Sequence, residues 1–177
     1  MVNDQWEIRL VHQSDNHVLA RVLKEVLVEM NVPEQGTAFA DPEIDAIYDA
    51  YQAKKANYWV VCNGDNIFGG AGIAPLHDGP GGYCELQKMY FLYDARGKGL
   101  GNQMIQKCLT QAKSYGYTDC YLETMPNMID AQKLYKKWGF TYIDHPIGNT
   151  GHCSCPVWMV KSLRSVSYTH LRAHETY

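Results

Sequence analysis

The stretch that decides the fold is residues 85–101, which read ELQKMYFLYDARGKGLG. Its first half is rich in β-forming residues, and its last six residues alternate glycine with other residues directly before an amphipathic segment. Glycines let backbone N–H groups approach a ligand closely, and the N-terminus of a helix offers unpaired donors and partial positive charge. Arg96 and Lys98 add two full charges. The stretch therefore predicts a strand, a phosphate-binding turn and a helix.

The glycine spacing excludes two common nucleotide-binding loops. Lys98 is followed by Gly99 and not by serine or threonine, so the stretch does not match GxxxxGK[ST]. It does not match GxGxxG either, because Asn102 stands where the third glycine is required. On these residues alone, a tight strand-to-helix turn without any ligand remains an alternative.

The residues before this stretch predict a strand, two helices and then antiparallel strands. Asp15 is a plausible N-cap for a helix whose apolar residues recur at spacings of three and four as far as Met30. A shorter helix is expected from Asp41 and Pro42, an N-cap followed by proline at the first helical position. The strands are expected over residues 6–11, 58–62, 67–76 and 83–93, with turn-rich clusters between the last three.

The residues after this stretch alternate between helical and strand periods. The strand–helix–strand order needs a crossover connection, which favours parallel pairing of the central strands. The sequence therefore predicts a mixed α/β sheet, antiparallel in its N-terminal part, parallel near its centre and flanked by about four helices. The expected segments are a helix over 98–116, a strand over 118–124, a helix over 127–138 and strands over 140–143 and 157–160.

Two motifs in this order resemble the GNAT superfamily of N-acetyltransferases. The first is the spacing [R/Q]-x-x-G-x-[G/A], which Arg96, Gly99 and Gly101 meet after a strand of the form E-L-x-x-x-Y-[V/F]. The second is AxxLYxxxGF over residues 131–140. The resemblance implies a bulge that splays the central parallel strands, and transfer of an acetyl group from acetyl-CoA to an amine without a metal.

The resemblance also implies where acetyl-CoA binds. The loop N–H groups would hold the pyrophosphate, the pantetheine arm would lie between the splayed strands, and an N–H near Tyr90 or Phe91 would polarise the thioester carbonyl. Asn127 sits one residue from the asparagine position that is common in the family. The implied cofactor-binding residues are Met89, Tyr90, Phe91, Arg96, Gly97, Lys98, Gly99, Leu100, Gly101 and Asn127.

Two residues are candidates for the proton transfers that acetylation of an amine requires. An alkyl amine with a pKa near about 10 is mostly charged at neutral pH, so a general base or a water relay must remove a proton. By resemblance, Glu85 occupies the position of that base, with a solvated carboxylate as the alternative. Tyr135 lies where the family places the proton donor to the CoA thiolate, although a core tyrosine fits its apolar stripe as well. His145 and His152 remain alternative bases, and we expect direct attack in a ternary complex.

The acceptor side is predicted less sharply. The resemblance places it against the first two helices and the loop before the last strand. Residues 25–53 contain acidic residues and no lysine or arginine, which predicts either a negative entrance for cationic amines or an ordinary solvated helix face. The acceptor is expected to be a small-molecule or peptide amine. A non-catalytic acyl-CoA-binding sensor is the alternative function.

Composition argues against several other classes of protein. A net charge of −3, without a basic stripe, gives no signal for nucleic acid. No apolar run reaches the roughly 18 residues of a membrane span, and the first residues lack a secretion signal. We therefore expect a cytoplasmic protein with its six cysteines reduced. By analogy with the family, a homodimer is also expected as an option. One acetyltransferase domain is expected over residues 1–163, and residues 164–177 are expected to be a non-native or disordered tail.

Overall fold

The computed structural model describes residues 4–164, so the expected tail from residue 165 lies outside the described residues. The strands are β1 (Trp6–Leu10), β2 (Asn57–Asn63), β3 (Asn66–Pro75), β4 (Tyr83–Phe91), β5 (Asp119–Thr124), β6 (Thr141–Ile143) and β7 (Val157–Ser162). The helices are α1 (Asn16–Glu29), α2 (Ile47–Ala50), α3 (Leu100–Ser114) and α4 (Ile129–Lys137), with 3₁₀ turns at Gln13–Asp15, Ala38–Ala40, Pro42–Asp45 and Tyr93–Ala95.

The strands form one seven-stranded sheet in the order β1-β2-β3-β4-β5-β7-β6. Neighbours from β1 to β4 are antiparallel, β4 and β5 are parallel, and β7 lies antiparallel between β5 and β6. The helix α3 supplies the crossover that the parallel pair requires. The predicted mixed sheet is confirmed, including the parallel pair at its centre.

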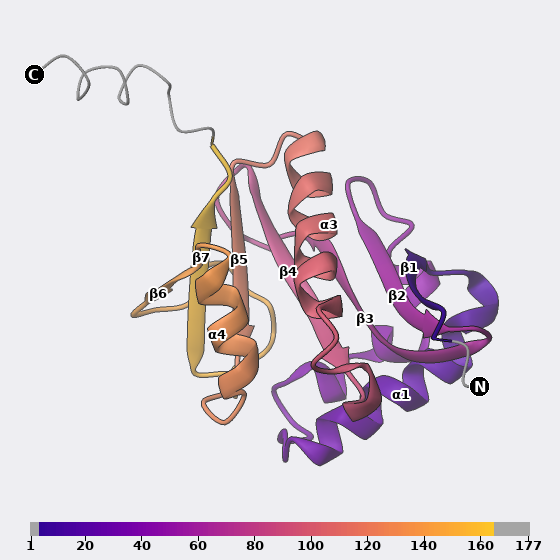
Figure 1. Ribbon diagram of the computed structural model, residues 1–177. Coiled ribbons are helices and arrows are strands. Elements are labelled where there is room, and N and C mark those ends of the chain that lie inside the picture. The colour runs from indigo at the N-terminus through magenta and orange to yellow at the C-terminus, as the bar shows by residue number, and fades with distance from the viewer. Residues whose placement is uncertain (1–3, 165–177) are drawn as a thin grey trace, which may run out of the picture.

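A bulge in β4 separates the two central strands. Between the pairs Gly70–Tyr90 and Gly72–Gln87, two residues of β4 face a single residue of β3. One of the two, Lys88, has a left-handed φ of 48°. The parallel ladder consequently joins only Tyr83–Glu85 to Asp119–Tyr121, after which the strands diverge, as Figure 1 shows. The splayed pair that the family resemblance implied is therefore present.

The helices cover both faces of the sheet and create two separate cores. Successive strand residues point to opposite faces, so Trp59 and Val61 pack beneath α3 while Tyr58 and Val60 pack against α1. Figure 1 shows α3 and α4 together on one face. The gap where β4 and β5 diverge lies at the centre of the sheet, between the two helical layers. Backbone groups of both strands are unpaired with each other there, so a ligand could bind in this gap.

The structure places Asp15 at the N-cap position of α1 as expected, but neither Asp15 nor Asp41 makes a capping hydrogen bond with its side chain. Asp15 precedes α1, but its carboxylate does not cap that helix, because it accepts 2.8 and 3.0 Å hydrogen bonds from Arg9 and a 2.7 Å bond from the His12 N–H. The segment after Asp41 forms a 3₁₀ turn and only one α-helical turn. The side chain of Asp41 does not cap a helix, because it pairs with Lys88 and His152.

The ends of α3 and α4 agree with the sequence. Gly116 and Gly139 follow the two helices with left-handed φ values of 84° and 93°, a conformation that favours glycine after a helix. Among the described residues, no helix is both long and apolar enough to cross a membrane.

Candidate active site

The glycine loop between β4 and α3 presents an open surface. A 3₁₀ turn follows β4, and α3 begins at Leu100. Gly97 and Gly99 have φ values of 71° and 77°, and a Cβ atom on either would meet nothing within 4 Å. These glycines are required by the backbone conformation and not by crowding, so the loop surface is free for a ligand. A Cβ on Gly101 would lie 2.8 Å from Leu134 Cδ2, so this glycine lets α3 approach α4.

The two basic residues of the loop contact the protein itself. Arg96 donates from Nε to the Phe91 carbonyl at 2.9 Å, and its guanidinium binds both carboxylate oxygens of Glu29 at 2.7 and 3.0 Å. This pair lowers the pKa of Glu29. Lys98 Nζ lies 5.7 Å from the ring centre of Trp6. Arg96 therefore ties the loop to α1.

A cavity lies where β4 and β5 diverge. Its walls include Met89 and Tyr90 from β4, Thr124 from β5 and Tyr135 from α4. Phe91, the third β4 residue expected to meet the pantetheine arm, does not line it, and its carbonyl already accepts from Arg96. Asn127 does not line it either, and its amide donates to the Met30 carbonyl at 2.7 Å.

Tyr135 is held in the wall of this cavity by packing. It is 6% exposed, and its ring lies 6.0 Å from that of Phe140 in an edge-on arrangement. Burial is the main cause that raises the pKa of its hydroxyl above the usual value, with contributions from Cys108 and Cys120. The hydroxyl therefore keeps its proton at neutral pH and can act only as a donor or a hydrogen-bonding group.

Glu85 is a buried carboxylate and not the solvated one that was the alternative. It is 5% exposed, and burial raises its pKa from 4.5 to about 7, although a hydrogen bond from Gln87 opposes the shift. Gln87 Nε2 donates to Glu85 at 2.6 Å, and Gln87 Oε1 accepts from the Tyr51 hydroxyl at 2.5 Å. A carboxylate with this pKa is suited to take up a proton near neutral pH.

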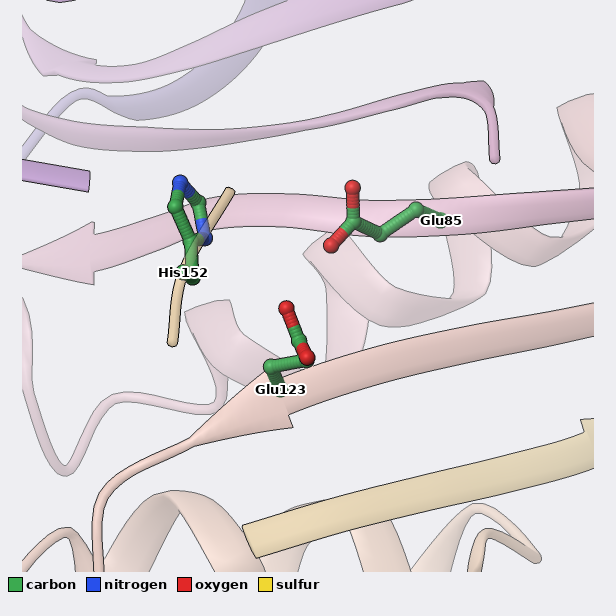
Figure 2. Close-up of side chains that lie close together, drawn as sticks. All are labelled: Glu85, Glu123 and His152. Atoms are coloured by element: carbon green, nitrogen blue, oxygen red, sulfur yellow. The ribbon is translucent and has the colours of Figure 1, made fainter. Parts of the chain in front are cut away.

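Glu85 forms a cluster with Glu123 and His152, which come from β4, β5 and the loop between β6 and β7 (Figure 2). One carboxylate oxygen of each glutamate and one ring nitrogen of His152 lie within 4.8 Å of one another. Glu123 accepts hydrogen bonds from the hydroxyls of Tyr121 (2.8 Å) and Thr150. Figure 2 shows the three side chains directed toward a common space.

A second set of charges orients this cluster. The side chain of Lys88 is 3% exposed and pairs with Asp41 at 3.2 Å and with Glu43 at 3.6 Å. Asp41 also holds His152 Nε2 at 2.8 Å. Burial opposes ionisation of His152, but the hydrogen bond and the charge of Asp41 prevail and raise its pKa. His145, by contrast, is exposed and contacts only the neighbouring Asp144 in the described part of the chain.

Comparison with known proteins decides the family. The family model for acetyltransferases of the GNAT type matches residues 24–140. The uncharacterized N-acetyltransferase YjgM of Escherichia coli is 40% identical over 157 residues, which are 88% of this chain and 94% of the relative. The chain belongs to the GNAT acetyltransferase family.

Solved GNAT structures agree with the fold of this acetyltransferase. A GNAT acetyltransferase from Staphylococcus aureus Mu50 superposes with a TM-score of 0.80 at 21% identity, over 90% of this chain and 99% of that one. An acetyltransferase from Salmonella typhimurium, whose structure contains its cofactor acetyl-CoA, superposes with a TM-score of 0.72 at 15% identity, over 92% of this chain and 96% of that one. At sequence identities this low, the structural similarity establishes the fold alone.

Sequence reasoning missed two residues of this GNAT site, Glu123 and Lys88. Glu123 follows the buried run of residues 120–122 in β5, and a carboxylate next to a buried strand segment was a usable signal. Lys88 gave no signal, because a lysine in the middle of β4 is unremarkable until the bulge turns it inward. Glu and His side chains also ligate divalent metals, so assays of this site require a chelator control.

Proposed function

We propose that this protein transfers the acetyl group of acetyl-CoA directly to a primary amine in a ternary complex. The observation that carries the proposal is the cavity between β4 and β5, which has the Tyr135 side chain in its wall and Glu123 beside the buried Glu85. The Salmonella protein of the same fold, with acetyl-CoA as its cofactor, supports the choice of acyl donor.

Acetyl-CoA would lie along the splayed strand. The backbone N–H groups of Gly97, Lys98, Gly99 and Gly101, with Leu100 at the start of α3, would bind the pyrophosphate. The pantetheine arm would follow Met89 and Tyr90, and a backbone N–H near Tyr90 or Phe91 would stabilise the oxyanion. Arg96 would support the loop through Glu29 and the Phe91 carbonyl. Asn127 would contact CoA as the family resemblance implies, with its side-chain amide nitrogen held by the Met30 carbonyl.

The proton transfers can be written so that they balance. The acceptor arrives as R–NH₃⁺ and gives one proton to the Glu85 carboxylate, which frees the lone pair of the nitrogen. The nitrogen attacks the thioester carbon, and the oxyanion forms. When the intermediate collapses, the C–S bond breaks, Tyr135 donates its proton to the thiolate, and the second nitrogen proton restores the tyrosine. The products are the amide, CoA–SH and one proton released to solvent from Glu85.

The first test is calorimetric titration with acetyl-CoA, followed by a screen of amines for release of the CoA thiol. We expect binding to the unmodified chain and none to Gly99→Glu, because the new side chain would occupy the phosphate surface. Gly116→Glu is the matched control: its φ of 84° is as strained, and a Cβ there also meets nothing within 4 Å, but it lies at the other end of α3.

The outcomes separate the candidate functions. Absence of acetyl-CoA binding by the folded protein overturns the proposal. Binding without thiol release from any amine in a broad panel favours the non-catalytic acyl-CoA-binding module instead.

A further inference from the structure

In the described part of the chain, His152 is the basic group beside Glu85 and Glu123, and neither glutamate pairs with a lysine or arginine. The nearby Lys88 is buried and forms its ion pairs with Asp41 and Glu43. Two carboxylates this close together favour a cation between them, because each disfavours the charge of the other.

The three groups can all act as hydrogen-bond acceptors. The hydroxyl groups of Tyr121 and Thr150 donate hydrogen bonds to the Glu123 carboxylate, which therefore already acts as an acceptor. His152 Nε2 faces the Asp41 carboxylate and carries the proton of that hydrogen bond, so Nδ1 is left with the lone pair when the ring is neutral. In the empty site the imidazolium form of His152 can supply the positive charge, and when a cation binds, the Nδ1 proton leaves to solvent and Nδ1 becomes an acceptor.

The geometry of the three acceptors fits an ammonium group. Because the three atoms lie within 4.8 Å of one another, there is a point no more than about 2.8 Å from all three, which is within the reach of charge-assisted hydrogen bonds. A primary ammonium group has three N–H donors, one for each acceptor, whereas secondary and tertiary ammonium groups have two and one. The cluster thus matches a primary ammonium group both in the number of hydrogen-bonding groups and in the sign of the charge.

We propose that Glu85, Glu123 and His152 form a three-acceptor cradle for the –NH₃⁺ group of the acceptor, which is an unhindered primary alkylamine. The proposal rests on the proposed function and adds two specificity-determining residues, Glu123 and His152, with Asp41 as the positioning residue that sets the tautomer. A carboxylate on the carbon next to the amine would lie against two glutamates and meet no free lysine. Free α-amino acids are therefore poor acceptors.

The experiment follows the side-chain resonances of His152 by NMR while the CoA-bound protein is titrated with n-butylammonium chloride in the presence of EDTA. Tetramethylammonium chloride is the matched probe, because it has the same charge and no N–H donor. We expect a saturable shift of His152 with n-butylammonium and none with tetramethylammonium, while the exposed His145 does not respond. Glu123→Gln should weaken the n-butylammonium affinity at least about ten-fold, and Glu34→Gln, which removes the same charge from an exposed position, should not.

Each outcome decides a separate point. Equal shifts with both cations, or no saturable shift at His152, overturn the cradle. If Glu123→Gln disturbs folding, the two-probe comparison in the unmodified chain still decides. Calorimetric binding of acetyl-CoA by the same sample tests the proposed function separately, so loss of the cradle with acetyl-CoA binding retained leaves that function standing.

Discussion

At the scale of single residues, Glu85 illustrates how burial changes the chemistry of a common side chain. Burial is the largest influence on its pKa and raises it, Glu123 raises it further, and Gln87, His152 and Lys88 act in the opposite direction. The result is a carboxyl group with a pKa of about 7. Such a group can accept a proton from an ammonium ion far better than an exposed glutamate can.

The pH dependence of activity follows from this value. In the parent protein, kcat/KM should fall as the pH decreases through about 7, since protonation removes the base. Glu85→Gln should lose at least about 100-fold in kcat/KM and show no such acidic limb. His145→Asn, which removes an exposed histidine from the loop that also carries His152, should retain the full pH dependence of kcat/KM. A pH–rate curve of Glu85→Gln that keeps its acidic limb and its magnitude would remove Glu85 from this role.

The same residue should make stability depend on pH. Its folded pKa of about 7 exceeds the ordinary 4.5, so between these values the folded state binds more protons than the unfolded state, and stability falls as the pH rises. Glu85→Gln lacks this penalty and should melt at a higher temperature than the parent at about pH 8, with the difference vanishing below about pH 4.5. Melting curves against pH, with Glu34→Gln as the control, test this. A difference independent of pH contradicts it.

Tyr135→Phe should separate chemistry from binding. Phenylalanine retains the packing against Phe140, so the affinity for acetyl-CoA should change by less than about two-fold, while kcat should fall by about 100-fold through loss of the proton donor. Steady-state kinetics and calorimetry measure the two quantities. Tyr142→Phe, at an exposed tyrosine bonded to Gln132, is the control, and full turnover by Tyr135→Phe would show that the donor lies elsewhere.

At the scale of elements, the bulge of β4 depends on the buried Lys88. The bulge places this residue in a left-handed conformation, with its side chain between Asp41 and Glu43 and its carbonyl bonded to the Tyr58 hydroxyl at 2.8 Å. The ion pairs join β4 to the segment that precedes α2, and the hydrogen bond joins β4 to β2. They hold β4 in the shape that opens the cavity beside β5.

Lys88→Ala should therefore cost much more stability than loss of an exposed ion pair. Removing one partner of a buried pair typically costs about 3–5 kcal/mol, and because Asp41 and Glu43 are partly exposed we expect the lower end, about 3 kcal/mol. Lys24→Ala, which breaks the exposed pair with Asp45, should cost less than about 1 kcal/mol. Urea unfolding of the two variants gives the comparison. Similar costs would mean that Lys88 does not support the bulge.

At the scale of the whole molecule, two cores share one sheet that is weakly joined at its centre. The first core lies beneath α3 and α4, and the second packs against α1. Only the pairs from Tyr83–Glu85 to Asp119–Tyr121 connect β4 with β5. A ligand bound between these strands would complete the interrupted ladder.

Acetyl-CoA should stabilise the protein, and its protection should be local. At about 100 times its dissociation constant, a ligand that binds only the folded state adds about 2.7 kcal/mol to the free energy of unfolding. We expect slower hydrogen exchange in peptides that contain Met89 to Phe91 and the loop before α3, and little change in β1 and β2. Exchange measured by mass spectrometry tests this, and uniform protection would argue against binding in the gap.

The sequence by itself determined the features that depend on neighbouring residues. The glycine loop, the amphipathic helices, the C-terminal glycines at 116 and 139 and the two family motifs all follow from short-range spacing and backbone preference. The order of elements then restricted the sheet to a mixed arrangement with a parallel centre. Glu85 and Tyr135 could be proposed from the motifs, although their burial could not.

Only the tertiary structure decided which distant side chains meet. Asp41 and His152 are separated by 111 positions, and their contact depends on how the loop before β7 folds over the turn before α2. The same packing engages the side chains of Asp15 and Asp41 in ion pairs, so neither side chain makes the capping hydrogen bond expected from the sequence. It also brought Glu123 to Glu85 and buried Glu85, and burial, which no local pattern encodes, is the largest cause of the raised pKa of the candidate base.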